Sequence, residues 1–396
     1  MKVLVDLRPL QSPDFAERGI GTYARNMLRV LNSRFEGSMD GLSADNFPRP
    51  DSPLPESKAR FYRPKFRKLV PFNWLFDRIV ISAKLCWSDY DLLHILEPFR
   101  HALTLPRRSR TRVVCTVYDL IPIIFPEHYF PGGIRGRVWS MGERFNSRLI
   151  PRIDRIIAIS ENTKRDLVER LGVEESRISV VYQSVDGEVL KPDGDPERDR
   201  AVLDGLNIPE KFILYVGDVD WRKDIASLAR ALARLKSPGD KDVPLVMAGG
   251  TIAERESHAA RGAWEAINNA GVAGRVITPG FVPQDELASL YRSAACLVFP
   301  SVYEGFGLPP LEAMACGCPV VTTDASSLPE VVGDAGILFH PGDDAACAEA
   351  IMKILDDGET ASEMRDAGLK RAERFSDENF AGGVIAAYHA AKKRAV

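Results

Sequence analysis

The sequence predicts an α/β protein built from two doubly wound domains that face one another across a cleft. Short apolar runs alternate with helical patterns along the whole chain, which is typical of parallel sheets covered by helices on both faces. The chain has 396 residues, too many for one ordinary hydrophobic core, and the alternation starts again near residue 210. We therefore expect domains at 1–190 and 210–376, a linker at 191–209 and a final helix at 377–396.

The composition is that of an ordinary globular protein, with 45% hydrophobic and 27% charged residues. The net charge of -3 argues against an overall basic surface for nucleic acid. The chain opens with a strand pattern instead of a signal peptide, and no apolar run is long enough to span a membrane, so we expect a cytoplasmic protein. The six cysteines form no Cys-x-x-Cys pair, and we expect buried free thiols.

The first half begins with a predicted strand at 2–7, and a helix opens at Gly19-Ile20-Gly21. A glycine-rich turn between the first strand and helix is a natural ligand edge, although it lacks the G-x-G-x-x-G pattern. The alternative is a tight turn that needs positive φ. Residues 36–57 predict a long loop, and a later strand at 112–117 ends at Tyr118-Asp119.

Residues 58–68 carry six basic side chains, no acidic one, and interleaved aromatic residues. A second basic cluster contains Arg107, Arg108, Arg110 and Arg112. One interpretation is a solvated edge. The other is contact with anionic lipid or with a lipid diphosphate acceptor, which would place the protein peripherally at the inner face of the cell membrane.

The second half repeats the alternation, with strands predicted at 212–216, 245–248, 276–278, 296–299, 320–323 and 336–339. The first of these strands is followed by Gly217, an Asp-Val-Asp turn, and then Arg222 and Lys223 at a predicted helix start. Cations at that position oppose the helix dipole, and a bound diphosphate would explain them. The alternative is a solvated pair beside Asp220 and Asp224.

A glycine loop between two carboxylates, Glu304 and Glu312, follows the strand at 296–299. It leads into a helix that we expect to begin near Pro309 or Pro310 and to end at Gly317. The N–H groups at a helix start favour anions, whereas carboxylates there would repel phosphate and are better suited to sugar hydroxyls. The alternative is a helix with acidic residues in its first turn.

Residues 304–312 resemble the E-x7-E signature of the retaining glycosyltransferases with two Rossmann-like domains, the GT-B fold of family 4. The form of the string is most similar to mannosyltransferases of surface-polysaccharide and lipopolysaccharide synthesis. The resemblance implies an acceptor side in the first domain, nucleotide-sugar binding in the second, and a final helix that crosses back to the first. It also implies sugar transfer from a nucleotide-diphospho-sugar, with GDP-mannose as the first choice, to a glycan or lipid-linked acceptor.

The resemblance assigns site residues by position in the motifs. The catalytic candidates are Glu304, Arg222, Lys223 and Asp119. The donor-binding candidates are Gly19, Gly21, Gly217, Gly305, Phe306, Gly307, Leu308 and Glu312. Tyr118 stands where the family commonly has a histidine, so the role of that position is open. No cofactor and no metal ion are expected, because Arg222, Lys223 and the helix starts would supply the positive charge.

Three alternatives stay open at this point. The first is a nucleotide-sugar epimerase of the same fold, against which the E-x7-E string argues. A phosphorylase would need a lysine that anchors pyridoxal phosphate, for which the sequence has no signature. A catalytically silent nucleotide-sugar-binding subunit is favoured only by Tyr118. A nicotinamide dehydrogenase is disfavoured, since no G-x-G-x-x-G follows either first strand.

Overall fold

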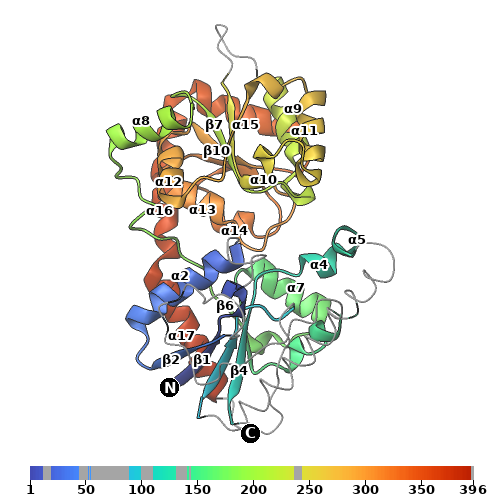
Figure 1. Ribbon diagram of the computed structural model, residues 1–396, viewed down its shortest axis with the longest axis vertical. Helices are drawn as coiled ribbons and strands as arrows, with labels where there is room; N and C mark the ends of the chain where they lie inside the picture. Colours follow the sequence, from blue (N-terminus) through green and yellow to red (C-terminus); the bar gives the residue numbers. More distant parts are fainter. Residues whose placement is uncertain are drawn as a thin grey trace. The chain divides into compact units, whose positions relative to one another are not determined.

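The computed structural model of the protein describes residues 1–11, 19–43, 52, 54, 89–99, 110–130, 141, 144–235 and 243–393. The chain divides into two units, Met1–Ser184 with Asp377–Val396, and Val185–Ser376 (Figure 1). Each unit is built around one six-stranded sheet, and every described strand pair is parallel. The predicted α/β class with two doubly wound sheets is confirmed.

The sheet of the first unit has the strand order β2-β1-β3-β4-β5-β6. Its strands are β1 (Lys2–Asp6), β2 (Ser38–Leu42), β3 (Leu92–Ile95), β4 (Arg112–Val117), β5 (Arg155–Ala158) and β6 (Ile178–Val180). Its helices are α2 (Gly19–Arg34), α4 (Ile121–Ile124), α5 (Pro126–Tyr129), α7 (Glu161–Leu171) and α17 (Asp377–Lys393). Helix α17 packs against α2, β4 and β5, so the end of the chain is part of the first unit.

Helix α7 illustrates how local sequence sets the bounds of an element. The Ser160 hydroxyl accepts a hydrogen bond from the N–H of Thr163, and Gly172 ends the helix in the left-handed conformation, with φ of 63°. Serine at a helix start and glycine at a helix end are the residue types that favour these two conformations. The predicted loop at 36–57 is wrong in part, because β2 lies inside it. That strand is short and contains Gly41 and Asp40, so it lacks the apolar run of its neighbours.

The sheet of the second unit has the strand order β12-β11-β10-β7-β8-β9. Its strands are β7 (Ile213–Val216), β8 (Leu245–Ala248), β9 (Val276–Gly280), β10 (Cys296–Phe299), β11 (Val320–Thr323) and β12 (Ile337–Phe339). Its helices are α8 (Pro196–Gly205), α9 (Ile225–Arg234), α10 (Gly250–Ala253), α11 (His258–Asn269), α12 (Gln284–Ser293), α13 (Leu308–Ala315), α14 (Leu328–Val332), α15 (Asp344–Asp356) and α16 (Gly358–Ala372).

Helices cover both faces of this second sheet. Alternate residues of β7, β8 and β10 form one buried cluster with the apolar sides of α9, α11 and α15. Helix α13 packs against β10, β11, α12 and α16. The predicted linker at 191–209 contains α8, which packs on α12 and belongs to this unit. The Arg292 and Asp199 side chains join the two helices, at 2.5 Å in a partly buried ion pair.

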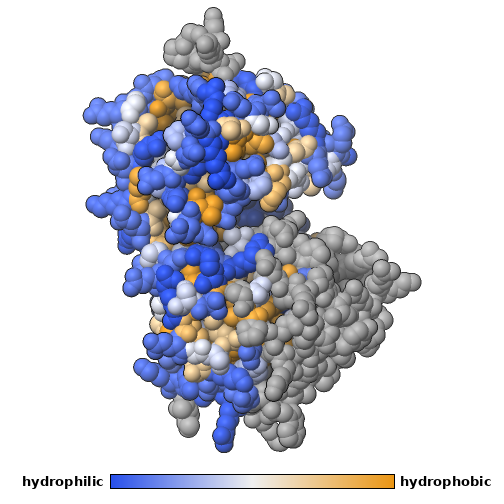
Figure 2. Space-filling model, turned by 60° about the vertical axis from the view of Figure 1, so that its left-hand side comes forward, coloured by the Kyte–Doolittle hydropathy of each residue, from blue (hydrophilic) through white to orange (hydrophobic). Residues whose placement is uncertain are grey.

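The face in Figure 2 is mainly hydrophilic on the second unit, with apolar residues in separate patches. Within the described residues, no helix is long and apolar enough to cross a membrane. The described cysteines, which are Cys115, Cys296, Cys316, Cys318 and Cys347, are buried free thiols as predicted.

Candidate functional site

The candidate site of the second unit lies at the point where its strand order reverses. Counted from β7, the order of this sheet is 6-5-4-1-2-3, so the chain leaves β7 toward one edge and returns on the other side as β10. Ligands of open α/β sheets bind at the carboxyl ends of the strands at such a switch point. Arg222 and Lys223 follow β7, and Glu304 follows β10, so three of the predicted catalytic residues come from the two strands that flank this point.

Glu304 joins the two cations directly. Lys223 Nζ lies 2.6 Å from Glu304 Oε1, and Arg222 donates to Glu304 Oε2 at 2.9 Å. The Lys223 ammonium also lies over the ring of Phe299, 4.4 Å from its centroid. Glu304 and Lys223 are buried, whereas about a fifth of the Arg222 side chain (22%) is exposed. The arrangement is a charged cluster open to solvent on its arginine side.

Electrostatics in this cluster favour the carboxylate form of Glu304. Burial alone would raise its pKa, but the charges of Lys223 and Arg222 outweigh that effect and bring the pKa down to about 2. For Lys223, burial lowers the pKa and the charge of Glu304 opposes the change. An anion that binds Arg222 and Lys223 would therefore compete with Glu304 for the same hydrogen-bond donors.

Hydroxyl groups after β11 hold the Glu304 loop in place. The Ser326 hydroxyl accepts from the N–H of Glu304 at 2.8 Å, and Ser326 itself has a positive φ of 50°. The Ser327 hydroxyl donates to the carbonyl oxygens of Glu304 (2.9 Å) and Phe306 (2.6 Å). The carbonyl of Arg222 accepts from the N–H of Val302 at 2.7 Å, which ties the two strand ends together. The sequence analysis missed both serines.

The glycine loop ends at α13, which starts one residue before the predicted Pro309. Gly307 has a φ of 123°, and a Cβ atom there would come within 2.9 Å of Leu328, so only glycine fits. The N–H groups of Gly307 and Leu308 have no hydrogen-bond partner within the described chain, whereas Pro309 and Pro310 have no N–H. Two backbone donors therefore remain at this helix start.

Phe306 does not offer its side chain to a ligand. Its ring is buried and makes an edge contact with Phe375, at a centroid distance of 5.8 Å. Gly305 is also buried. Of the predicted donor-binding residues in this loop, Phe306 can take part only through its backbone.

Arg222 and Lys223 do not start the long helix, so the predicted conflict with its dipole is wrong. They lie in a separate 3-10 turn, η4 (Trp221–Lys223), and the Asp224 carboxylate caps α9 by accepting from the N–H of Ser227. Their pairing with Glu304 explains the charges instead. Gly217 adopts a φ of 144° beside this turn, and its missing Cβ would lie 3.9 Å from the Lys223 side chain.

The two aspartates of the Asp-Val-Asp turn have local partners. Asp218 accepts from the hydroxyl of Thr251 at 2.9 Å, and Asp220 accepts from the N–H of Arg222 at 3.2 Å. Over the part of the chain that the structure describes, no group of three or more His, Cys, Asp or Glu side chains has the geometry of a metal site.

Glu312 lies on α13, in surroundings very different from those of Glu304. The hydroxyl of Tyr291, on the neighbouring α12, donates to Glu312 Oε2 at 2.8 Å. Burial raises the pKa of Glu312, and this hydrogen bond opposes the change. Tyr291 has no signal in the sequence apart from its place in an apolar helix pattern.

The first unit contains Gly19, Gly21 and Asp119, and each lies at the carboxyl edge of its sheet or in the helix that follows β1. Gly19 and Gly21 form the first turn of α2 with negative φ, so the alternative of a tight left-handed turn is wrong. Among the described residues, apart from its chain neighbours and the backbone of α2, no atom lies within 4 Å of a Cβ built at Gly19. The Asp119 carboxylate accepts from the N–H of Ile121, the first residue of α4, at 3.0 Å.

Tyr118 precedes Asp119 and has an unusual hydroxyl group. Its ring meets that of Tyr23 edge-on, at 5.0 Å between centroids, and its hydroxyl oxygen is buried without a hydrogen-bond partner among the described residues. Burial raises its pKa well above the usual value for tyrosine. A buried hydroxyl without a partner is costly, which makes this group a candidate contact for a ligand.

His94, near the end of β3, has both ring nitrogens occupied. Nδ1 is 2.8 Å from the Tyr388 hydroxyl of α17, and Nε2 is 2.9 Å from the Thr116 hydroxyl of β4. Burial lowers its pKa to about 3. His94 is therefore a structural residue that joins α17 to the sheet.

The basic segment 58–68, together with Arg107 and Arg108, lies outside the described residues. Arg110 is exposed, and Arg112 pairs with Asp154 at 3.1 Å. The predicted lipid contact of residues 58–68 stays a prediction.

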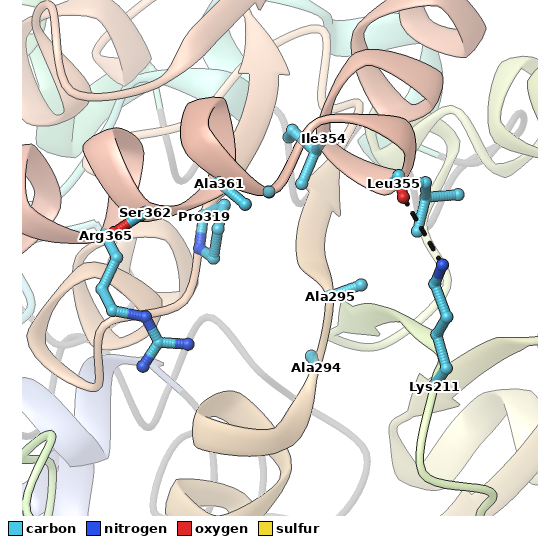
Figure 3. A pocket seen from close by; sticks show the side chains of 10 residues that line it. Lys211, Ala294, Ala295, Pro319, Ile354, Leu355, Ala361, Ser362 and Arg365 are labelled. Carbon is cyan, nitrogen blue, oxygen red and sulfur yellow. Dashed lines mark hydrogen bonds between the residues drawn. The ribbon is translucent and has the colours of Figure 1, made fainter.

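A separate pocket of about 300 Å³ lies at the amino ends of β10 and β11, on the edge opposite the Glu304 cluster. Lys211 and Arg365 stand on opposite sides of it, and Ala294, Pro319 and Ile354 line it between them (Figure 3). Lys211 donates weakly to the carbonyl of Leu355, at 3.5 Å. None of the predicted site residues lines this pocket.

Comparison with known proteins covers both halves of the chain. The family model for glycosyl transferases group 1 matches residues 203–371, and the model for glycosyltransferase family 4 matches residues 18–189. The chain is 30% identical over 285 residues to the O-antigen chain mannosyltransferase B of Escherichia coli, which covers 72% of this chain and 71% of that protein.

A second relative is the serotype-specific mannosyltransferase WbdA of Escherichia coli, 31% identical over 271 residues. The match covers 68% of this chain but 32% of WbdA, so the chain spans about a third of that relative. Among solved structures, Anabaena Alr3699/HepE in complex with UDP and glucose superposes with a TM-score of 0.72 at 19% identity, over 97% of this chain and 98% of that one. With two parallel sheets, an E-x7-E loop at the switch point of the second and matches over both halves, the chain belongs to the family 4 glycosyltransferases and has their GT-B fold.

Proposed function

We propose that this protein is a retaining glycosyltransferase that takes a sugar from a nucleotide-diphospho-sugar and passes it to a glycan or lipid-linked acceptor in surface-polysaccharide synthesis. The names of the Escherichia coli relatives support mannose as the sugar, and GDP-mannose is the first donor to test. UDP in the Anabaena structure makes UDP-sugars the second choice.

The observation that carries the proposal is the Glu304 cluster at the switch point. The two cations, Arg222 and Lys223, and the two backbone N–H groups at the start of α13 lie in the same unit and follow neighbouring strands at the same sheet edge. A leaving nucleoside diphosphate needs such a preorganised positive site, because its charge grows as the bond to the sugar breaks. One donor of this kind typically lowers the barrier by roughly 3–4 kcal/mol.

The proposed reaction breaks the bond between the anomeric carbon and the leaving phosphate oxygen. The acceptor hydroxyl attacks from the face on which the diphosphate leaves, and its proton passes to the leaving phosphate. Arg222, Lys223 and the N–H groups of Gly307 and Leu308 stabilise the diphosphate charge. Glu304 accepts hydrogen bonds from sugar hydroxyls, and Glu312 accepts from the ribose diol.

Donor binding would change the partners of Glu304. Its two carboxylate oxygens accept from the same cations that a diphosphate would use, at 2.6 and 2.9 Å. We therefore expect Glu304 to hold Arg222 and Lys223 in place before the donor binds, and to share them or turn toward the sugar afterwards. This exchange keeps the buried cation Lys223 paired in both states, which avoids an uncompensated charge.

We propose that the reaction needs no metal ion and no other cofactor. Both aspartates of the Asp-Val-Asp turn already serve local hydrogen bonds, and Arg222 and Lys223 neutralise the phosphates. The rate of sugar transfer in excess EDTA should equal the rate without EDTA. Loss of activity in EDTA that Mg²⁺ or Mn²⁺ restores would assign the neutralising role to a metal ion.

The deciding experiment is a donor screen followed by turnover. Thermal unfolding is measured with GDP, UDP and ADP and with their hexose conjugates, since a ligand at a hundred times its dissociation constant stabilises by about 2.7 kcal/mol. We expect stabilisation by one nucleotide series and release of that nucleotide from its sugar conjugate. Binding without any turnover would favour a silent binding subunit, and no binding in the series would refute the proposal.

The proposal extends to a lipid-linked acceptor at an anionic membrane, reached through residues 58–68. Flotation with phosphatidylglycerol-containing liposomes tests this part by itself. We expect binding by the wild type and loss of binding when the six basic residues are neutralised. Equal flotation of the two proteins would remove the membrane contact and leave the transferase proposal intact.

A further inference from the structure

The two carboxylates of the E-x7-E motif have opposite surroundings. Both oxygens of Glu304 accept from cations, at 2.6 and 2.9 Å. The carboxylate of Glu312 has a single hydrogen bond within the described residues, from the hydroxyl of Tyr291 to Oε2 at 2.8 Å. Glu312 is partly exposed, and its Oε1 has no partner in the part of the chain that is described. One oxygen of Glu312 is held, and the other is left as an acceptor.

Tyr291 is well placed to fix the direction of that acceptor. It lies on α12, which packs against α13, and its side chain is completely buried. A buried tyrosine ring has few rotamers, so the position of its hydroxyl oxygen is fixed. The hydrogen bond from this hydroxyl to Oε2, at 2.8 Å, restricts rotation of the carboxylate.

We propose that Tyr291 is a positioning residue that orients the Glu312 carboxylate, so that its free oxygen accepts from vicinal hydroxyls of the donor. The inference rests on the proposed function, in which Glu312 holds the ribose diol. A fixed acceptor loses less conformational entropy when it binds a diol than a freely rotating one does. The same hydrogen bond also favours the ionised form of Glu312, which is the form that accepts from both hydroxyls.

Tyr291 is the main hydrogen-bond partner of the Glu312 carboxylate, because the charged groups nearby contact other residues. Cys316 at the end of α13 and Cys318 after it lie near Tyr291, and burial raises the pKa of both thiols. Arg292 of α12 is held by Asp199, and Arg365 of α16 lies against Gly317. Burial raises the pKa of Glu312, and the hydrogen bond from Tyr291 opposes that change.

The pH dependence of donor affinity distinguishes two roles of Tyr291. In one, Tyr291 orients the Glu312 carboxylate and favours its ionised form; in the other, Tyr291 only packs in the core. Glu312 binds the diol as a carboxylate, so donor affinity falls as pH drops through the pKa of Glu312. Tyr291→Phe removes the hydrogen bond that favours the carboxylate, so the pKa of Glu312 rises and the acid limb moves to higher pH. A purely structural defect would lower affinity equally at every pH.

The experiment measures GDP-mannose and UDP-glucose affinity by calorimetry between pH 5 and pH 8. We expect Tyr291→Phe to weaken binding of the accepted donor about tenfold at pH 7, the equivalent of one hydrogen bond, and to move the acid limb upward. Glu312→Gln should weaken binding and remove the limb. Tyr388→Phe is the matched control: it removes a buried hydroxyl with a 2.8 Å bond in the first unit, and its affinity should equal that of the wild type.

The outcomes distinguish the proposed role of Tyr291 from the assignment of Glu312 to the ribose site. If Tyr291→Phe weakens binding uniformly or leaves it unchanged while Glu312→Gln weakens it, Tyr291 does not position Glu312, although the donor site stands. If Glu312→Gln binds like the wild type, the assignment of the ribose site is wrong and this inference falls with it. Circular dichroism spectra of all variants at each pH show whether the fold is kept.

Discussion

The carboxyl edges of the two sheets have the same parallel topology but carry different kinds of side chain. Both sheets are parallel and six-stranded, and both put polar residues after their strands. In the second unit those residues are charged and meet one another, as Glu304 does with Lys223. In the first unit His94 is neutral and fully hydrogen-bonded, and Tyr118 keeps a buried hydroxyl without a described partner. Parallel topology decides where polar residues gather, whereas the residue types decide whether that edge can stabilise a leaving phosphate.

The largest expected effect is the loss of turnover when a cation is removed from the carboxyl edge of the sheet in the second unit. Lys223→Ala should lower kcat by about 10²–10³-fold with a smaller change in donor KM, because its contact strengthens as the leaving phosphate gains charge. Glu304→Gln should behave in the same way. Glutamine is preferred to alanine there, since it keeps the side-chain volume and one acceptor oxygen for the buried Lys223, although both substitutions remove the counter-charge.

Lys211→Ala is the control for the cation experiment. Lys211 lies at the opposite edge of the same sheet, and its side chain has one hydrogen bond among the described residues, to the Leu355 carbonyl at 3.5 Å, so kcat should equal that of the wild type. Donor-saturation kinetics on the three variants, with thermal melts to check folding, give the comparison. Turnover within threefold of the wild type in Lys223→Ala would show that charge at this edge does not drive the reaction.

A second contrast between the edges is their response to acid. His94 has a folded pKa of about 3 and an ordinary unfolded value near 6.5, so the unfolded state takes up the proton first. The contribution of His94 to the free energy of unfolding is fully present above about pH 6.5 and is lost as pH falls toward 3. Between pH 7 and pH 5 the free energy of unfolding should fall by about 2 kcal/mol. Glu304, with a folded pKa of about 2, loses its contribution only below about pH 4.5.

Urea unfolding of the wild type and of His94→Gln at pH 7, 6 and 5 tests this order. The variant should be less stable at pH 7 and should show a flatter pH dependence, since glutamine takes up no proton. Parallel pH curves for the two proteins would mean that His94 is accessible to protons in the folded state.

The sequence predicted the elements that lie in the cores better than those at the edges. The bounds of β4 and β10 agree with prediction because both are continuous apolar runs between polar residues. Strand β2 was missed because it is an edge strand with Asp40 and Gly41 in its sequence. Helix α8 was missed although Asp195 caps it and Pro196 occupies its first turn, two signals that the sequence does contain.

For the candidate site, sequence motifs located the charged residues but not their contacts. The spacing of Arg222, Lys223 and Glu304 along the chain does not reveal that the three side chains meet, because that depends on which strands are neighbours in the sheet. Tyr291 and Ser327 have no motif of their own, since each acts through one hydrogen bond across helix or loop packing. Only the three-dimensional arrangement relates them to the glutamates.

A smaller effect is expected from the loop that supports Glu304. Ser327→Ala removes the hydroxyl that donates to the carbonyls of Glu304 and Phe306, both buried, and should lower the free energy of unfolding by about 1–2 kcal/mol. Turnover should fall by up to about tenfold, because the position of Glu304 becomes less restricted. Ser362→Ala, at an exposed position of α16, should leave both quantities unchanged. An unchanged melting temperature in Ser327→Ala would contradict the support role.

The smallest expected change is that of Tyr118→Phe, and its sign is opposite to that of the same substitution at Tyr291. Tyr118→Phe removes a buried hydroxyl without a described partner and keeps the edge contact with Tyr23, so it should stabilise the protein by about 1 kcal/mol. The same substitution at Tyr291 removes a 2.8 Å bond to a carboxylate and should destabilise by about 1–3 kcal/mol. Urea unfolding of the two variants measures the contrast, and transfer assays on Tyr118→Phe add the functional part. A more stable variant with slower transfer would assign the Tyr118 hydroxyl to substrate, because a group that is costly in the free protein then gains its partner in the complex. A less stable variant would show that the hydroxyl already has a partner, and the difference between the two edges would rest on charge alone.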